Sequence, residues 1–197
     1  MRLLEHRIHN FTKQKQSIHI MKKSTLLSAI AFAFMMLVSG NVQAQKFSGL
    51  DKSPMDAASF PSSYRVSDKT AKVVYSRPQL NGRLLSKLAP NGKVWRTGAN
   101  EAAEITFYKD VNFGGKAVSA GTYTLFTIPG DNEWTVILSS DINVWGAYSY
   151  NEGNDVVRVM GKVTEGSESL EAFSMAFDDD GNLHMGWDKV RVEVSMN

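Results

Sequence analysis

The sequence predicts an all-β fold, a single-domain antiparallel β-sandwich that is either jelly-roll-like or an open barrel. Three observations predict it. Apolar and polar residues alternate in short runs through the second half of the chain, which is the period of half-buried strands. Gly, Pro, Asn and Asp separate these runs at short intervals. No stretch after residue 44 keeps a convincing helical period, and the best helix candidate is the short run 84–88.

The expected strands follow one another from residue 73 to the C-terminus. The run 122–128 ends at a Pro-Gly turn and the next run begins a few residues later, so these two strands are expected to form a hairpin. The last four strands are expected to form a meander with Val, Phe, Met and Trp side chains facing inward. The expected strands are 73–75, 105–108, 116–119, 122–128, 134–138, 157–163, 173–177, 183–187 and 190–194.

Residues 21–44 have the organisation of a secretory signal peptide. Two lysines form its basic start, the apolar stretch runs over 26–38, and the small-residue exit predicts cleavage after Ala44. The apolar stretch is shorter than the about 20 residues that a membrane span needs, which favours a cleaved signal over the alternative of an uncleaved anchor. Residues 1–20 precede a second Met and are interpreted as a misassigned upstream extension, with a real cytoplasmic extension as the alternative. The protein is therefore expected to be exported, either periplasmic or secreted, without a membrane span after cleavage.

Removal of the signal leaves 153 residues, enough for one domain with its own core. We expect an irregular lead-in over 45–68 and the β domain over 69–197. The first 44 residues hold six Lys or Arg and one Glu, so the remainder carries 16 basic and 19 acidic residues, a net charge of −3. Such a charge does not favour nucleic acid as a partner, because nucleic acid selects a basic face. The absence of cysteine excludes a thiol nucleophile, thiolate metal sites and a lipid-anchored cysteine.

The run 92–101 (GKVWRTGANE) combines a large aromatic ring, a guanidinium, an amide and a carboxylate within a glycine-broken segment. An ordinary turn needs Gly, Asn, Asp or Pro for backbone reasons, and none of these reasons requires Trp beside Arg. Two further segments, 75–83 and 145–150, are also rich in arginine or aromatic residues. The residues that we expect to bind a ligand are Arg77, Arg83, Trp95, Arg96, Asn100, Glu101, Trp145 and Tyr148.

These segments have two interpretations. In the first, arginine forks and aromatic faces line a polar pocket at one end of the sandwich, because such groups pair with anions and stack on rings. In the second, Arg77 or Arg96 pairs with Glu101 or Glu104 inside the loops, while the tryptophans fill the core. The direction of the Arg96 side chain is expected to distinguish the two.

Other chemistry has weaker support. His184 is the only histidine after the signal, and it is expected to face solvent on its strand rather than to serve a Ser-His-Asp triad. The oxygen-rich segment 178–182 is expected to be an acidic hairpin turn, with a calcium loop as the alternative. No transition-metal site and no cofactor are expected, because several His or Cys ligands would be needed.

Five segments resemble a known family, the exported bacterial proteins grouped as domain of unknown function 2911 (DUF2911), seen mostly in Bacteroidetes-like bacteria. With the spacing between them, these segments cover the chain from about Ser67 to the C-terminus. The resemblance implies a β-rich exported domain, and it implies no catalytic residues because the family has no established activity. The segments are 74–78 (VYSRP), 92–102 (GKVWRTGANEA), 121–129 (GTYTLFTIP), 134–137 (WTVI) and 145–148 (WGAY).

Three hypotheses follow from the sequence. The leading one is a non-catalytic binding or envelope-associated module for a small polar ligand that is anionic or sugar-like. The second is a hydrolase acting on an envelope glycan or ester, with Glu101 as acid or base and a second carboxylate facing the same cleft. The third is a purely structural domain.

Overall fold

The computed structural model describes Lys13, Ser28 and residues 45–197. The chain divides into two units, Met1–Ser48 and Gly49–Asn197, and only the second is built from described residues throughout. The expected upstream extension (1–20) and signal peptide (21–44) lie outside the described residues, apart from those two single positions.

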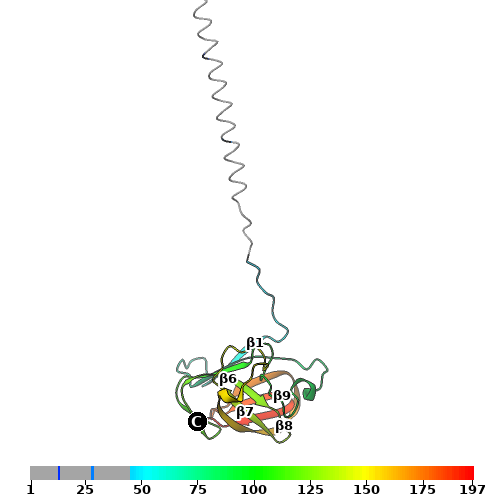
Figure 1. Cartoon of the computed structure of the whole chain (residues 1–197). Helices are drawn as coiled ribbons and strands as arrows, with labels where there is room; N and C mark the ends of the chain where they lie inside the picture. Colours follow the sequence, from blue (N-terminus) through cyan, green and yellow to red (C-terminus); the bar gives the residue numbers. More distant parts are fainter. Residues whose placement is uncertain (1–12, 14–27, 29–44) are drawn as a thin grey trace, which may run out of the picture. The chain divides into compact units, whose positions relative to one another are not determined.

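The second unit is nearly all β, which confirms the predicted fold class (Figure 1). One very short α-helix and one 3-10 turn interrupt the strands, and the helix coincides with the expected run 84–88. The elements are β1 (Met55–Phe60), β2 (Ala71–Ser76), α2 (Leu85–Leu88), β3 (Ala103–Phe107), β4 (Val111–Phe113), β5 (Lys116–Val118), β6 (Gly121–Ile128), β7 (Glu133–Ser139), η1 (Glu152–Asn154), β8 (Asp155–Phe177) and β9 (Leu183–Val194).

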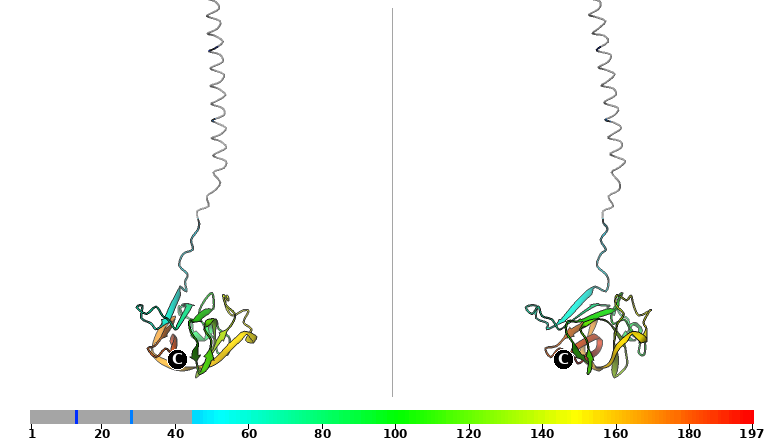
Figure 2. Two further views of the ribbon diagram at one scale, coloured as in Figure 1. Left: turned by 90° about the vertical axis from the view of Figure 1, so that its left-hand side faces the viewer. Right: turned by 60° about the vertical axis from the view of Figure 1, so that its left-hand side comes forward.

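Seven strands form one antiparallel sheet in the order β1-β2-β3-β6-β7-β8-β9, and β4 pairs with β5 in a small second sheet. The large sheet curls into a half-barrel, so that β1 and β8 contact each other although four strands separate them in the sheet (Figure 2). The chain after β2 completes the curl: the Leu80 N–H donates to the Glu171 carbonyl and the Phe173 N–H donates to the Pro78 carbonyl, each at 2.9 Å. Of the forms expected from the sequence, the open barrel describes this sheet.

The concave side of the sheet holds the main hydrophobic core, which is rich in aromatic rings. A smaller cluster of Ala102, Phe126 and Ile137 forms a separate buried group, covered by residues from the loops that follow α2 and β7. Both sides of the β6–β7 hairpin are therefore buried. This burial agrees with the nearly continuous apolar runs of these two strands, and the predicted hairpin is confirmed.

Two expectations about the strands are wrong. The lead-in 45–68 is not irregular throughout, because Met55–Phe60 forms β1, with Ala58 and Phe60 packed on the core. The four C-terminal strands are two long strands, β8 and β9, whose pairing shifts register between Glu165 and Leu170 and again before Ser174. Such irregularities bend a strand without ending it, so the polar stretch between the apolar runs stays in the ladder although it resembles a loop.

Candidate functional site

The three segments singled out in the sequence meet in the folded domain. The backbone of Gly98 lies so close to Ser76 that a Cβ on Gly98 would stand 3.1 Å from the Ser76 carbonyl oxygen. The segment 92–101 also pairs with the aromatic segment, because the Gly146 N–H donates to the Asn100 carbonyl at 3.0 Å and Glu101 forms an isolated bridge with Trp145. Residues distant in the sequence therefore form one surface beside the start of β3.

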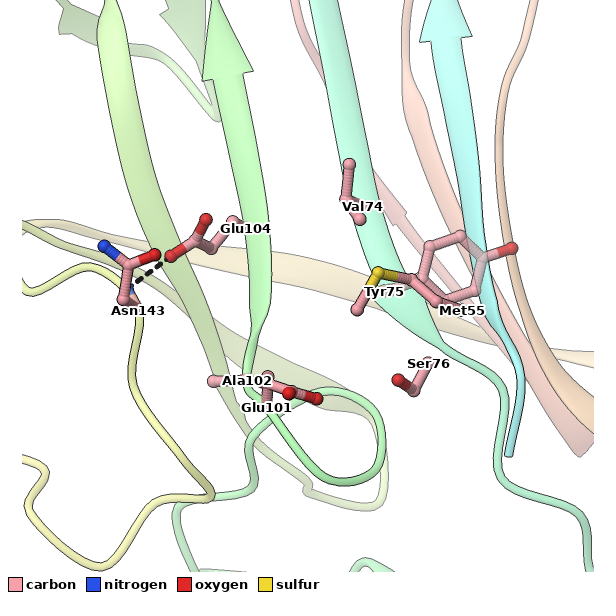
Figure 3. A pocket seen from close by; sticks show the side chains of 8 residues that line it. All are labelled: Met55, Val74, Tyr75, Ser76, Glu101, Ala102, Glu104 and Asn143. Carbon is pink, nitrogen blue, oxygen red and sulfur yellow. Dashed lines mark hydrogen bonds between the residues drawn. The ribbon is translucent and has the colours of Figure 1, made fainter. Parts of the chain in front are cut away.

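A hollow of about 250 Å³ opens among these segments on the outer face of β2 and β3 (Figure 3). Val74 and Glu104 are cross-strand partners on this face, since period-two alternation turns their neighbours Val73 and Ile105 into the core. The hollow is lined by Met55, Val74, Tyr75, Ser76, Glu101, Ala102, Glu104 and Asn143.

The two glutamates give the hollow its polar character. The Glu104 carboxylate accepts a 2.6 Å hydrogen bond from the Asn143 backbone N–H, drawn as the dashed line in Figure 3. The Glu101 side chain is exposed and extends toward the Ser76 side of the hollow. The rest of the wall is mostly apolar, so the hollow combines hydrogen-bond acceptors with surfaces suited to carbon atoms.

The loop that leads into β3 is held in an unusual backbone conformation. Thr97 has φ of +54° and Asn100 has φ of +59°, and a β-branched residue such as threonine rarely occupies this left-handed region. The buried Thr97 hydroxyl donates to the Thr127 hydroxyl at 3.2 Å, and Trp95 and Thr127 exchange two backbone hydrogen bonds. Backbone strain of this kind persists only where surrounding contacts impose it, as they do here.

Arg77 and Arg83 stabilise the fold through hydrogen bonds to other parts of the chain. The Arg77 guanidinium donates to the Phe173 carbonyl at 3.1 Å and to the Ser174 hydroxyl at 2.7 Å, and it forms a 3.0 Å ion pair with Asp56. It therefore links β1 to β8 across the opening of the curled sheet. Arg83 donates to two backbone carbonyls three and four residues before it and holds its own turn.

Trp95 belongs to the core, and Arg96 has no charged partner among the residues that the structure describes. The Trp95 ring is 7% exposed and stacks on Trp187, with ring centroids 5.5 Å apart and planes 18° from parallel. Arg96 is half-buried, and within the described residues its Nε is buried without a hydrogen-bond partner. Neither Arg77 nor Arg96 pairs with Glu101 or Glu104, so the expected ion-paired staple between these residues is wrong. The Glu101 and Glu104 carboxylates line the hollow, whereas the Arg77 guanidinium is bonded to its partners on the other side of β2.

The remaining expected residues lie at the surface of the same region. Trp145 is 59% exposed and Tyr148 is 86% exposed, so Trp145 does not fill the core as the structural interpretation required. The Asn100 side chain donates to Asp51 at 3.1 Å. The pKa of the Asp51 carboxyl is lowered by the Ser53 N–H and then by this amide.

Sequence reasoning missed several residues that form the hollow, namely Met55, Val74, Ala102 and Asn143. Because side chains alternate along β2, Val74 faces away from the core if Val73 faces into it, and this could have been predicted from the sequence. Met55 could not, because it lies in a strand that the sequence did not predict. Sequence reasoning also missed a cluster beside the smaller core, in which the Tyr150 hydroxyl donates to Asp155 and Arg158 donates to both, each at 2.6 Å. Burial, and then the bond to Asp155, raises the pKa of Tyr150.

The acidic turn is a hydrogen-bonded hairpin turn, as expected. One Asp178 oxygen accepts from the Asp180 and Asn182 backbone N–H groups, and the other lies 2.9 Å from the His184 Nε2. The His184 contact, followed by the Asn182 bonds, lowers the pKa of Asp178 to about 2. Within the part of the chain that the structure describes, no three His, Cys, Asp or Glu side chains gather as a metal site.

The fold and the hollow define a class of protein: an open-barrel β domain with a small pocket on the outer face of its sheet. The chain belongs to the family described as a protein of unknown function, DUF2911, whose model matches residues 53–196. No curated protein and no solved structure matches the chain. Over the described residues, no helix has the length and apolar character to cross a membrane.

Proposed function

We propose that this protein is an exported, non-catalytic binding module that takes a small polar ligand into the hollow beside β3. The observation that carries the proposal is one hollow, lined by residues of segments 75–83 and 92–101 together with their neighbours, that combines apolar walls with two carboxylates. Small-molecule sites typically have this composition, in which a few polar groups orient a ligand held by apolar surface. A volume of about 250 Å³ suits one ring, since pockets for drug-sized ligands begin near about 300 Å³.

The backbone around the hollow supports binding because it is already formed. Asn100, which precedes Glu101, and Asn143, whose N–H bonds Glu104, both have positive φ. Each is tied by a hydrogen bond to another segment of the chain. A ligand would therefore meet lining groups that need little further ordering, which reduces the entropic cost of association. The exposed Trp145 and Tyr148 rings add flat surfaces near the same loops.

The binding proposal is tested by mapping backbone amide resonances during titration with a panel of monosaccharides and small organic acids and amines. A ligand of the hollow is expected to shift the amides of Ser76, Ala102 and Asn143 first. The matched control is the distant turn at Gly181, whose amide is expected to stay unchanged. If no compound in the panel moves the three lining amides, the binding proposal fails.

Export is part of this proposal and rests on the signal-like pattern of residues 21–44. Its test is independent of binding. When the gene is expressed in a bacterium with an outer membrane, N-terminal sequencing of periplasmic material is expected to begin at Gln45. Recovery of the chain in the cytoplasm with its first residues intact would contradict export.

One observation keeps a hydrolase as a second candidate: Glu101 and Glu104 line the same hollow. Glycoside hydrolysis needs a pair of carboxyl groups on either side of the scissile bond. The test is release of a chromophore from nitrophenyl glycosides and esters, with Glu101→Gln as the inactive variant. Turnover by the unmodified protein that this variant loses would favour the hydrolase over the binding module.

A further inference from the structure

We infer that the hollow beside β3 selects ligands that carry a positive charge, such as a protonated primary amine on a small ring. This inference rests on the proposed function and specifies its ligand. It departs from the anionic ligand that the arginine-rich sequence suggested, because Arg77 and Arg83 bond to the protein framework and no arginine lines the hollow.

The charged residues that line the hollow are both negative. Its lining contains two carboxylates and no Lys, Arg or His. The nearest arginine in the sequence, Arg77, follows the lining residue Ser76, but its guanidinium is engaged by Asp56, the Phe173 carbonyl and the Ser174 hydroxyl. An anion entering the hollow would meet two negative charges and no arginine guanidinium to offset them, whereas a cation would meet two charges of opposite sign.

The carboxylates also retain accepting capacity. Ionised glutamate only accepts hydrogen bonds, and its two oxygens offer about four lone-pair positions. Glu104 uses one oxygen for the Asn143 N–H, and among the described residues no hydrogen bond reaches the Glu101 side chain. An ammonium group, with three donors and no acceptor, complements such a site better than a carboxylate or phosphate does.

The walls favour an organic cation over a bare metal ion. Met55, Val74 and Ala102 present carbon to the hollow, and a metal ion would need oxygen or nitrogen ligands on those sides. Trp145, whose backbone bridges to Glu101, carries an exposed indole, and indole faces attract organic cations. The combined chemistry is that of a cationic head held by carboxylates with a ring against apolar walls.

The experiment uses three sugars that share one ring and differ in charge: glucosamine, glucose and glucuronate. Affinity is measured calorimetrically on the full chain at low salt, and amide mapping locates each sugar. Glucosamine is expected to bind at least tenfold more tightly than glucose, glucuronate is expected not to bind, and the preference is expected to shrink in high salt.

Two variants test the residues. Glu101→Gln and Glu104→Gln each keep the side-chain length and remove one charge, and the amide oxygen at position 104 can still accept from the Asn143 N–H. Each is expected to reduce the preference for glucosamine over glucose at least threefold. Glu193→Gln, an exposed glutamate on β9, is the matched control and is expected to leave it unchanged.

The outcomes separate the two levels of the proposal. If glucuronate or glucose binds the lining amides as tightly as glucosamine does, the charge inference is overturned while the binding proposal stands. If none of the three sugars moves those amides, the inference is overturned, and the wider panel then decides the binding proposal. Unfolding midpoints of the variants identify any loss that comes from misfolding.

Discussion

Replacing Trp95 with alanine tests whether the most conspicuous residue of the sequence serves stability. Its ring is nearly fully buried and contacts three aromatic rings: Trp187 at 5.5 Å, Phe173 at 5.0 Å and Trp134 at 6.0 Å. A buried tryptophan removes about 150–250 Å² from water, which at about 25 cal/mol per Å² amounts to about 4–6 kcal/mol. Measured Trp→Ala costs in cores are about 3–5 kcal/mol, so we expect about 4 kcal/mol.

The assay is urea unfolding followed by far-ultraviolet circular dichroism. With a slope of about 2 kcal/mol per molar urea, the Trp95→Ala midpoint is expected to fall by about 2 M. The matched control is Trp145→Ala, which removes the same side chain from an exposed position and is expected to cost less than about 1 kcal/mol. If Trp95→Ala does not fold, Trp95→Phe provides the measurable variant, with a smaller loss.

The result that would refute this reasoning is a similar, small cost for both alanine variants. It would mean that the aromatic cluster around Trp95 is not tightly packed, and that the Trp95 ring is available to contact a ligand. Loss of stability at Trp95 alone would instead show that the shape of this loop depends on the core beneath it, whatever the hollow binds.

Three further predictions concern the framework of the hollow and the distant β8–β9 turn. Tyr75→Phe removes a buried hydroxyl that both donates to and accepts from the β8 backbone, so we expect a loss of about 1–3 kcal/mol in urea unfolding; an unchanged midpoint would contradict those bonds. Gly98→Ala places a Cβ 3.1 Å from the Ser76 carbonyl, and we expect a loss of about 1–3 kcal/mol together with shifted amides around the hollow; a silent substitution would show that the two segments are not in close contact. The pKa of Asp178 falls from 3.8 to about 2 on folding because of its contact with His184, so its stabilisation is complete above pH 3.8 and is lost as pH falls toward 2. Asp178→Asn is expected to flatten the acid limb of the unfolding midpoint in that window, and an unchanged limb would refute the contact.

Much of the fold was predictable from sequence because alternation is a local property. Runs such as 122–128 and 134–138 carry their strand period and their turn within a few residues, and the structure confirms the hairpin that they form. Prediction failed where the signal was weak or misleading. The strand β1 has few large apolar residues, and the bend of β8 carries polar residues that resemble a loop although its backbone remains paired with β9.

The site was partly predictable for the same reason. Sequence reasoning identified segments 75–83, 92–101 and 145–150, and folding does bring them together. It could not assign their side chains. Whether an arginine faces a pocket or a neighbouring carbonyl depends on groups more than ninety residues away, as with Arg77 and Phe173.

By itself the sequence determined the all-β class, the family and the segments that gather at one surface, because period, turn chemistry and composition are properties of consecutive residues. Only the tertiary structure decided which residues of those segments face outward. The curl of the sheet buries Trp95 and engages Arg77, and it leaves Glu101 and Glu104 beside the hollow. The charge of the candidate site is therefore set by long-range packing, because hydrogen-bond partners from distant strands determine which charged groups remain available to a ligand.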